Sequence, residues 1–438
     1  MNGYEFWANG ATDPDRVPEK PEALAGIRVL EVTPGHFGGM VAASVLGEFG
    51  AEVIKIEPPG GDPARRYAPE GIAVEGTGLP FLSEARNRRF VTLSLDRPEG
   101  REIFRRLAER SDVVVETVGA KRMEEDGIGF LSLSRTVPGL IWLSLSLYGS
   151  FGPNAGRALK DSDILCQALS GVPNIIGEPE DFDRPLPHQV PTRLGNWHGW
   201  FVAGLWGTFG VLAALHHRAA SGRGQFVDLS GAEGLMKFAD YNITWMHTAG
   251  RARTRLGNFD PAVFPYTYIR CRDGHAFLAA YNNEAFESLM EIIGRPELAQ
   301  DPRFSTPASR VRLEHEIALQ QILEEWSGDL TADEILRRIE EHTAKKSGPA
   351  AAVVTGRVNR PLETLAEENW HARGCFIRAT DPIYGDLLLA APPWKMSGTP
   401  PRIRSVCRPP GADNETVYAD LLGWTRTDLE NFAGRGIL

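Results

Sequence analysis

A glycine-rich turn marks the part of the chain whose residue types best suit a ligand site. Gly35, Gly38 and Gly39 fall between a short apolar run, Ile27–Val32, and a helical stretch, Met40–Gly50. Glycine permits a sharp bend and a close approach of the backbone to a ligand. The spacing differs from the dinucleotide pattern G-x-G-x-x-G, so a tight turn with close helix packing explains these glycines equally well.

A charged segment rich in Gly and Pro, Glu57–Arg66, follows a second apolar run, Val53–Ile56. Open α/β sheets bind their ligands just outside the carboxyl ends of their strands. Two runs separated by a helix predict two parallel strands, so this segment and the glycine turn should meet at one edge of the sheet. We therefore expect a nucleotide-like ligand there.

Two further side chains could take part in nucleophilic or acid–base chemistry. Asp163 stands in KDSDILCQALSG, where it is most simply explained as a residue that caps or braces its own helix. His198 precedes a helical stretch rich in small residues, Gly199–Leu215, and could act as an acid or base. A lone histidine at a helix start is more often structural, so both residues are weak candidates.

Strands and helices alternate along the first half of the chain, which predicts a doubly wound parallel sheet. The expected elements include strands Val91–Leu95, Val113–Glu116, Leu140–Leu147 and Phe226–Leu229, a helix Pro98–Arg110 opened by Asp96, and a helix Leu131–Thr136. After Asp240 a hairpin, Tyr266–Arg270 with Ala276–Ala280, precedes helices rich in Glu and Arg over Asn283–His342. The last part, Leu362–Leu438, reads as strands and turns. We expect an N-terminal arm at 1–23, a large domain beginning at 24–230, a small α+β domain at 250–342, and a return to the large domain with a linker at 345–438.

The composition excludes several classes of protein. A formal net charge of -10 over 438 residues argues against nucleic acid as the main partner. Four cysteines far apart, without a C-x-x-C pair, favour a reducing cytoplasm, and no metal site suggests itself. The apolar stretch Phe201–Leu215 is interrupted by glycines and is too short for a membrane span. We expect a cytoplasmic protein that binds no nucleic acid and no membrane.

Several ordered blocks make the chain resemble the family III CoA-transferases (CaiB/BaiF type) from Leu24 to about Pro401. They are LAGIRVLEVT, GAEVIKIEPPGGDPAR, RNRRFVTLSLDRPEGREIF, SDVVVETV, PGLIWLSLSLYGSFGP, QALSG, HHRAASGRGQFVDLSGAEGL and AEENWHARG. The resemblance implies a Rossmann-like large domain made from both chain ends, a small α+β domain from the middle, and two interlocked subunits. It also implies coenzyme A and acyl-CoA as substrates, with no metal or redox cofactor.

The family works through an aspartate that attacks an acyl-CoA thioester and then carries CoA as an enzyme thioester. Aligned on the family pattern without a gap, this chain has Trp200 where the nucleophilic aspartate is expected, and RLGNWHGWFVA around it contains no acid. A gap in the alignment or a repacked core would also explain Trp200. A racemase is disfavoured, because its acidic position is lost and Ser162 replaces the histidine of its G-H-D motif.

The resemblance also indicates which residues would contact CoA. The matching positions in the first turn and in two later blocks are Gly35, His36, Phe37, Arg65, Asn87 and Arg88. Other positions differ from those of relatives: Pro58 replaces a frequent basic residue, and the segment MEEDGIG places Glu124, Glu125 and Asp126 where repulsion would oppose a phosphate.

A chain that keeps the family blocks but has Trp200 at the nucleophile position resembles the aspartate-lacking subunit of succinyl-CoA:benzylsuccinate CoA-transferase. That resemblance implies a non-nucleophilic subunit beside a paralogous family III subunit that supplies the aspartate, in an interlocked heterodimer or heterotetramer. Its donor would be succinyl-CoA and its acceptor an aromatic succinate such as benzylsuccinate. Two alternatives remain open: a homomeric acyl-CoA enzyme that uses Asp163 or His198, and a non-catalytic CoA-binding protein.

Overall fold

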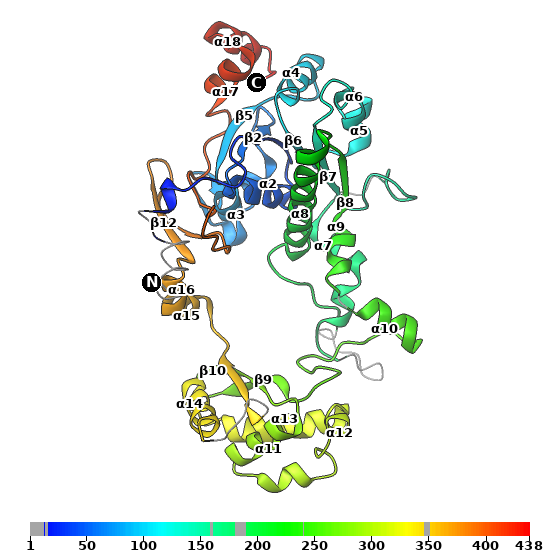
Figure 1. The fold of residues 1–438 in the computed structure, drawn as a ribbon, viewed down its shortest axis with the longest axis vertical. Helices are drawn as coiled ribbons and strands as arrows, with labels where there is room; N and C mark the ends of the chain where they lie inside the picture. The colour runs from blue at the N-terminus through cyan, green and yellow to red at the C-terminus, as the bar shows by residue number, and fades with distance from the viewer. Residues whose placement is uncertain (1–12, 14–15, 158–160, 180–189, 240, 346–350) are drawn as a thin grey trace. The chain divides into compact units, whose positions relative to one another are not determined.

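The computed structural model describes residues 13, 16–157, 161–179, 190–239, 241–345 and 351–438, and most of the expected arm at 1–23 lies outside them. The chain divides into two compact units (Figure 1). The large unit takes residues up to Val172, Arg193–Thr244 and Glu368–Leu438. The small unit takes Pro173–Thr192 and Trp245–Glu367.

A six-stranded parallel sheet forms the centre of the large unit, as the alternation of strands and helices predicts. Its order is β5-β2-β1-β6-β7-β8. The strands are β1 (Arg28–Val32), β2 (Glu52–Glu57), β5 (Arg88–Thr92), β6 (Val113–Glu116), β7 (Ile141–Ser146) and β8 (Phe226–Ser230). The chain moves outward from β1 in one direction through β2 and β5, and in the other through β6, β7 and β8. The crevice between the carboxyl ends of β1 and β6 is therefore the topological switch point, where such sheets bind ligands.

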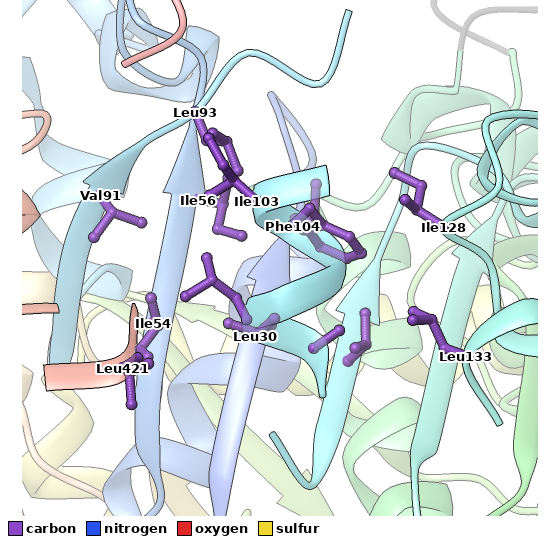
Figure 2. Close-up of a cluster of buried hydrophobic side chains, with 14 of the residues drawn as sticks. Leu30, Ile54, Ile56, Val91, Leu93, Ile103, Phe104, Ile128, Leu133 and Leu421 are labelled. Carbon is purple, nitrogen blue, oxygen red and sulfur yellow. The ribbon is translucent and has the colours of Figure 1, made fainter. Parts of the chain in front are cut away.

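One face of the sheet is covered by α4 (Pro98–Ala108), whose apolar residues recur with helical period. Figure 2 shows Ile103 and Phe104 of this helix directed at side chains of the strands beneath, among them Leu30 and Ile56. The helix begins at Pro98 with Arg97 as its N-cap. Asp96, which was expected to open the helix, pairs with Arg122 at 2.7 Å. The same face is also covered by α5 (Ala120–Glu125), α6 (Phe130–Leu133) and α17 (Asn414–Leu422).

The other face is covered by α2 (Phe37–Glu48) and α8 (His198–Ser221), which pack on each other through glycines. A Cβ on Gly204 would lie 2.5 Å from the carbonyl oxygen of Gly38, and a Cβ on Gly38 would lie 2.8 Å from that of Trp200. Real Cβ atoms do not approach so closely, so the two backbones touch with no side chain between them. Of the three glycines that suggested a ligand turn, only Gly35 has a positive φ, and Gly38 and Gly39 serve helix packing.

The C-terminal part of the large unit contains helices that the sequence reading missed. Strands and turns were expected over Leu362–Leu438, and the pair β12 (Phe376–Asp381) and β13 (Gly385–Ala390) is present. The same stretch also holds α16 (Glu368–Ala372), α17 and α18 (Arg426–Gly434). The apolar residues of α17 complete the core beneath α4, which stabilises a helix too short to persist alone. The remaining large-unit elements are β3 (Ala73–Val74), β4 (Thr77–Gly78), α3 (Leu79–Glu84), α7 (Asp163–Ser170) and α9 (Gly231–Lys237); α10 (Asn242–Ala249) crosses the boundary between the units.

The small unit is an α+β fold with its own apolar core. A three-stranded antiparallel sheet of order β11-β10-β9 contains the predicted hairpin. Its strands are β9 (Tyr266–Cys271), β10 (Gly274–Ala279) and β11 (Val354–Arg357). Its helices are α11 (Asn283–Ile292), α12 (Pro307–Arg310), α13 (Leu313–Ser327), α14 (Ala332–Thr343) and α15 (Pro361–Ala366).

Candidate active site

The first wall of the site is the turn that joins β1 to α2. Gly35 has a φ of 68°, and its N–H donates to Asp62 Oδ1 at 2.8 Å. His36 caps α2, because its Nδ1 accepts the N–H of Gly39 at 3.2 Å. A ring nitrogen that accepts a hydrogen bond carries no proton, so the proton of the neutral ring lies on Nε2. The helix cap thereby fixes the tautomer of His36.

The second wall holds Asp163, the first residue of α7, in a position set by the start of α8. Gln167 Nε2 donates to Asp163 Oδ2 at 2.6 Å, and the backbone N–H of Trp200 donates to Asp163 Oδ1 at 2.9 Å. Gly199 makes room for the carboxylate, since a Cβ there would stand 3.1 Å from Oδ1. Asp163 is 6% exposed. Its carboxylate thus lies at the N-terminal ends of two helices, where backbone dipoles favour negative charge.

Gln167 joins Asp163 to the segment that leads into α8. The side-chain oxygen of Gln167 accepts the N–H of Leu194 at 2.8 Å, and its Nε2 donates to the carbonyl of Leu194 at 3.1 Å. These two bonds fix which end of the amide faces Asp163. We call residues 193–200 the strap, because Trp200 holds the Asp163 carboxylate directly and Leu194 holds it through Gln167.

A second carboxylate, Asp161, lies between His36 and Trp200. Its Oδ2 is 3.2 Å from His36 Nε2, and its Oδ1 accepts from Trp200 Nε1 at 3.2 Å. The ring centroids of His36 and Trp200 are 4.6 Å apart. Burial opposes ionisation of Asp161, but the hydrogen bonds that His36 and Trp200 donate to it outweigh burial and lower the pKa of this carboxyl. Asp161 is therefore an oriented, ionised carboxylate.

The two residues singled out around the start of α8 have different surroundings. Trp200 is 5% exposed and contacts both carboxylates, one through its backbone and one through its indole. His198 is exposed, and its ring contacts the carbonyl of Gly195. The structure thus brings Trp200 and Asp163 together, while no described contact joins His198 to either carboxylate.

The cations expected to contact CoA are engaged in ion pairs inside the large unit. Arg65 pairs with Glu57 at 2.6 Å, and Arg88 pairs with Glu31 at 2.5 Å, with all four side chains nearly or fully buried. Burial opposes charge on Glu31, yet Arg88 and Lys55 together lower its pKa. Charges this deep are retained only when paired, so these arginines hold strands and turns together. Their contact with CoA stays a prediction.

The remaining expected CoA contacts are also engaged. The side chain of Asn87 donates to the carbonyls of Gly47 and Arg402 and accepts the N–H of Arg404, which ties the C-terminal segment to the sheet. Phe37 is buried within α2. Gly35 donates its N–H to Asp62, as described, so the backbone at this point of the first turn is already occupied.

Two adjoining cavities follow the carboxyl edge of the sheet. The first, about 220 Å³, is walled mainly by apolar residues at the ends of β1, β2 and β5. The second, about 460 Å³, lies at the ends of β6 and β7 and is bordered by Lys121, Arg122, Arg157 and Asp161. Arg122 and Val118 line both. An apolar slot continued by a basic cavity suits a purine followed by phosphates.

The acidic segment near these cavities opposes phosphate less than its sequence suggests. Glu124 accepts the N–H of Leu131 at 2.6 Å, and Asp126 pairs with Arg101 at 2.6 Å. Of the three acids only Glu125 lines the basic cavity, where it is 3.7 Å from Lys121. Two of the three carboxylates therefore bond to neighbouring groups and do not face the cavity.

A third cavity, about 690 Å³, opens beside the strap and is lined by aromatic rings. Phe37 lies 4.9 Å from Trp197 and 5.3 Å from Phe201 between ring centroids, and Tyr67 lies 5.9 Å from Trp197. Trp197 has a φ of 54°, a left-handed backbone that is uncommon for a bulky residue. These rings give the cavity apolar walls.

Two other properties of the described residues bear on the site. They contain no group of three His, Cys, Asp or Glu side chains that could hold a metal ion. Among them α8 alone is long and apolar enough to cross a membrane by composition, and it packs against α2, α9 and β7, as core helices do.

The sequence reading missed Asp161, Lys121 and Arg122. Asp161 was visible as the first acid of KDSD, two residues before Asp163 at a helix start. Lys121 and Arg122 stand directly before MEEDGIG, so three acids follow the basic pair closely and offset its charge in the sequence. Neither signal alone indicates a site, because the contacts that matter come from other elements.

Comparisons with known proteins bear on the fold and the family of the chain. Residues 24–414 match the sequence profile of CoA-transferase family III. The chain is 33% identical over 421 residues to succinyl-CoA–D-citramalate CoA-transferase of Chloroflexus aurantiacus, covering 95% of this chain and 98% of that protein. It is 34% identical to the alpha subunit of succinyl-CoA–L-malate CoA-transferase of that organism, covering 98% and 96%, and 30% identical to a beta subunit, covering 95% and 98%. A CaiB/BaiF family protein from Brucella suis has a similar structure, with a TM-score of 0.77 and 28% identity over 91% of this chain and 99% of that one.

Proposed function

Because the chain belongs to CoA-transferase family III, we propose that it transfers CoA from succinyl-CoA to a short dicarboxylic acid, with its own Asp163 as the covalent nucleophile. The observation that carries this proposal is the pair of donors on Asp163, Gln167 Nε2 and the backbone N–H of Trp200. The side chain of Trp200 cannot act as a nucleophile, but its backbone N–H binds the carboxylate of Asp163. A carboxylate therefore lies beside the position where the sequence around Trp200 contains no acid.

The reaction balances without metal, water or redox change. A carboxylate oxygen of Asp163 attacks the donor thioester carbonyl and the C–S bond breaks. The CoA thiolate departs, and Asp163 and the succinyl group form a mixed anhydride. The thiolate attacks the Asp163 acyl carbon, an anhydride C–O bond breaks, and succinate departs. The acceptor carboxylate then attacks the enzyme thioester and expels the thiolate, which attacks the acceptor acyl carbon and releases Asp163 as a carboxylate.

The same two donors suit the tetrahedral intermediates on Asp163. Negative charge develops on the remaining carboxyl oxygen whenever thiolate or acceptor attacks the acyl carbon. Whichever oxygen is bonded, the other retains one donor, from Gln167 or from Trp200. Donors fixed in advance at a developing oxyanion are the main source of catalysis in acyl transfer. The small exposure of Asp163 also protects the anhydride and the thioester from water.

CoA would lie along the carboxyl edge of the sheet. In this placement the adenine occupies the apolar slot, the phosphates meet Lys121, Arg122 and Arg157, and the thiol end approaches Asp161 and Asp163. The placement sets aside Arg65 and Arg88, whose ion pairs are buried. The ion pairs of Arg122 with Asp96 and of Lys121 with Glu125 are exposed, so these two cations can exchange their partners for a phosphate.

The names of relatives support the substrate class. The relatives described above act, by name, between succinyl-CoA and D-citramalate or L-malate. These acceptors are dicarboxylic acids, as is benzylsuccinate, so an acceptor panel should contain all three. The four described cysteines are free, which favours a reducing compartment such as the cytoplasm.

A heteromer is the second candidate, favoured by relatives named as alpha and beta subunits. In that arrangement a paralogous subunit would supply the nucleophile, and this chain would support it. The two candidates differ in whether Asp163 itself becomes acylated.

Borohydride trapping tests the proposal directly. The purified chain is incubated with succinyl-CoA, treated with borohydride and digested, and the peptide containing Asp163 is examined by mass spectrometry. A thioester on Asp163 would be reduced to the alcohol, which leaves homoserine at that position. We expect trapping in the wild type and a loss of turnover of at least ~10³-fold in Asp163→Asn.

Asp161→Asn is the matched control, since it removes a neighbouring carboxylate on the same segment and should still be trapped at Asp163. Native mass spectrometry of the complex from source cells gives the composition. If the chain alone is not trapped, and a paralogue restores transfer even to the Asp163→Asn variant, the nucleophile belongs to the paralogue. Trapping at another residue of this chain would also refute the assignment.

A further inference from the structure

We infer that the aromatic cavity beside the strap is the acyl-group subsite, in which Arg193 binds the non-reacting carboxylate of the dicarboxylic acid. This inference rests on the proposed function and adds to it a specificity-determining residue. It concerns the end of the substrate that takes no part in bond making.

Arg193 is a cation with no ion-pair partner among the described residues. Arg193 lines the cavity and is exposed. Across the residues for which contacts are described, none of the ion pairs includes Arg193, whereas Arg65 and Arg88 are both paired. Guanidinium binds carboxylate through two parallel hydrogen bonds, and apolar surroundings strengthen such a pair.

The walls of the cavity suit the carbon skeleton of a short acid. Phe37, Tyr67, Trp197 and Phe201 provide apolar faces, and Asn196 and Ser83 provide polar groups. Glu84 also lines the cavity, and no ion pair joins it to Arg193. Its negative charge opposes a carboxylate at its own position, so a dianionic acid should place its remote carboxylate at Arg193.

Covalent and hydrogen-bonded connections link Arg193 to the nucleophile. The next residue, Leu194, exchanges two hydrogen bonds with Gln167, which in turn donates to Asp163. Trp197 and Phe201 of the cavity flank Trp200, whose N–H holds the other oxygen of Asp163. The strap therefore fixes the carboxylate-binding group and the nucleophile in one frame, as selection between a dicarboxylate and a monocarboxylate requires.

The test compares Arg193→Gln and Arg193→Lys with the wild type, using glutarate and pentanoate as acceptors of equal chain length. Arg223→Gln is the control, because it removes one exposed positive charge just beyond the C-terminal end of α8. We expect Arg193→Gln to raise KM for glutarate at least tenfold with kcat changed less than threefold, and to leave KM for pentanoate unchanged. Arg193→Lys should recover part of the glutarate affinity.

Binding of glutarate in the presence of free CoA, followed by tryptophan fluorescence, gives a second readout that needs no turnover. A tenfold weaker glutarate Kd in Arg193→Gln supports the subsite, even if the preparation transfers no CoA. A lack of CoA transfer would contradict the proposed reaction but not the subsite. An unchanged KM and Kd for glutarate in Arg193→Gln overturns the inference while leaving Asp163 trapping intact. Equal losses for glutarate and pentanoate overturn it as well, since they indicate a structural role.

Discussion

Replacement of Glu316 by Gln should remove a pH dependence from the stability of the small unit. Glu316 lies in α13, is 2% exposed, and its Oε1 is buried without a hydrogen-bond partner in the described part of the chain. Burial, with a smaller contribution from the charge of Asp260, raises the pKa of this carboxyl to about 7. The substitution keeps the shape of the side chain and removes its titration.

The size of the effect follows from the difference between the folded and unfolded pKa. The unfolded carboxyl titrates near 4.5, so the folded pKa of about 7 lies about 2.5 pH units higher. At about 1.4 kcal/mol per unit, ionisation of Glu316 costs the folded state about 3 kcal/mol. The folded state holds the proton more tightly, so its advantage is full below pH 4.5 and is lost as the pH rises to about 7.

Urea unfolding at pH 5 and pH 8.5 measures this difference, with hydrogen exchange in α13 reporting on the small unit. We expect the free energy of unfolding of Glu316→Gln to exceed that of the wild type by about 3 kcal/mol at pH 8.5, and the gap to shrink strongly at pH 5. Glu325→Gln, at an exposed position of the same helix, should show no such gap. Equal pH dependence in the wild type and Glu316→Gln would refute the reasoning.

Two further substitutions test the large unit. His36→Ala should lower the free energy of unfolding by ~1 kcal/mol, because the α2 cap is lost, and should also lower transfer activity. His36→Asn can still cap the helix but cannot hold Asp161. It should therefore recover the stability measured by urea unfolding but not the activity. Gly204→Ala should destabilise by ~1–3 kcal/mol, although alanine favours helices, because its Cβ would lie 2.5 Å from the Gly38 carbonyl. A rise in Tm for Gly204→Ala would show that α2 and α8 are not in backbone contact.

The sequence predicts the sheet well because each strand is a short buried run whose signal is local. Val113–Glu116 was predicted with its observed bounds, and the first strand and helix differ only at their ends. The helix α2 begins at Phe37, three residues before the expected start, because His36 caps it. By contrast, α17 depends on apolar partners from α4 and the sheet, which are distant in sequence, so its local pattern was insufficient.

The site could be predicted only in part, because its decisive contacts are long-range. Asp163 and Trp200 are 37 residues apart, and the group that meets the carboxylate is a backbone N–H, which no residue type reveals. The family alignment reports only the residue type at position 200, a tryptophan side chain that cannot act as a nucleophile. Arg65 and Arg88 have the sequence features of anion-binding residues, yet Glu57 and Glu31 on adjacent strands take up their charge.

The backbone-to-backbone contact between α2 and α8 limits how the acceptor specificity of this protein can change by mutation. A contact made of backbone atoms has no rotamers, so it cannot absorb a small displacement by rearranging side chains. The turn at His36 and the first turn of α8 must therefore shift together or not at all. Altered acceptor preference should then arise in the side chains that line the aromatic cavity, and libraries built at Tyr67, Arg193 and Phe201 should yield new specificities more often than libraries built along the two helices.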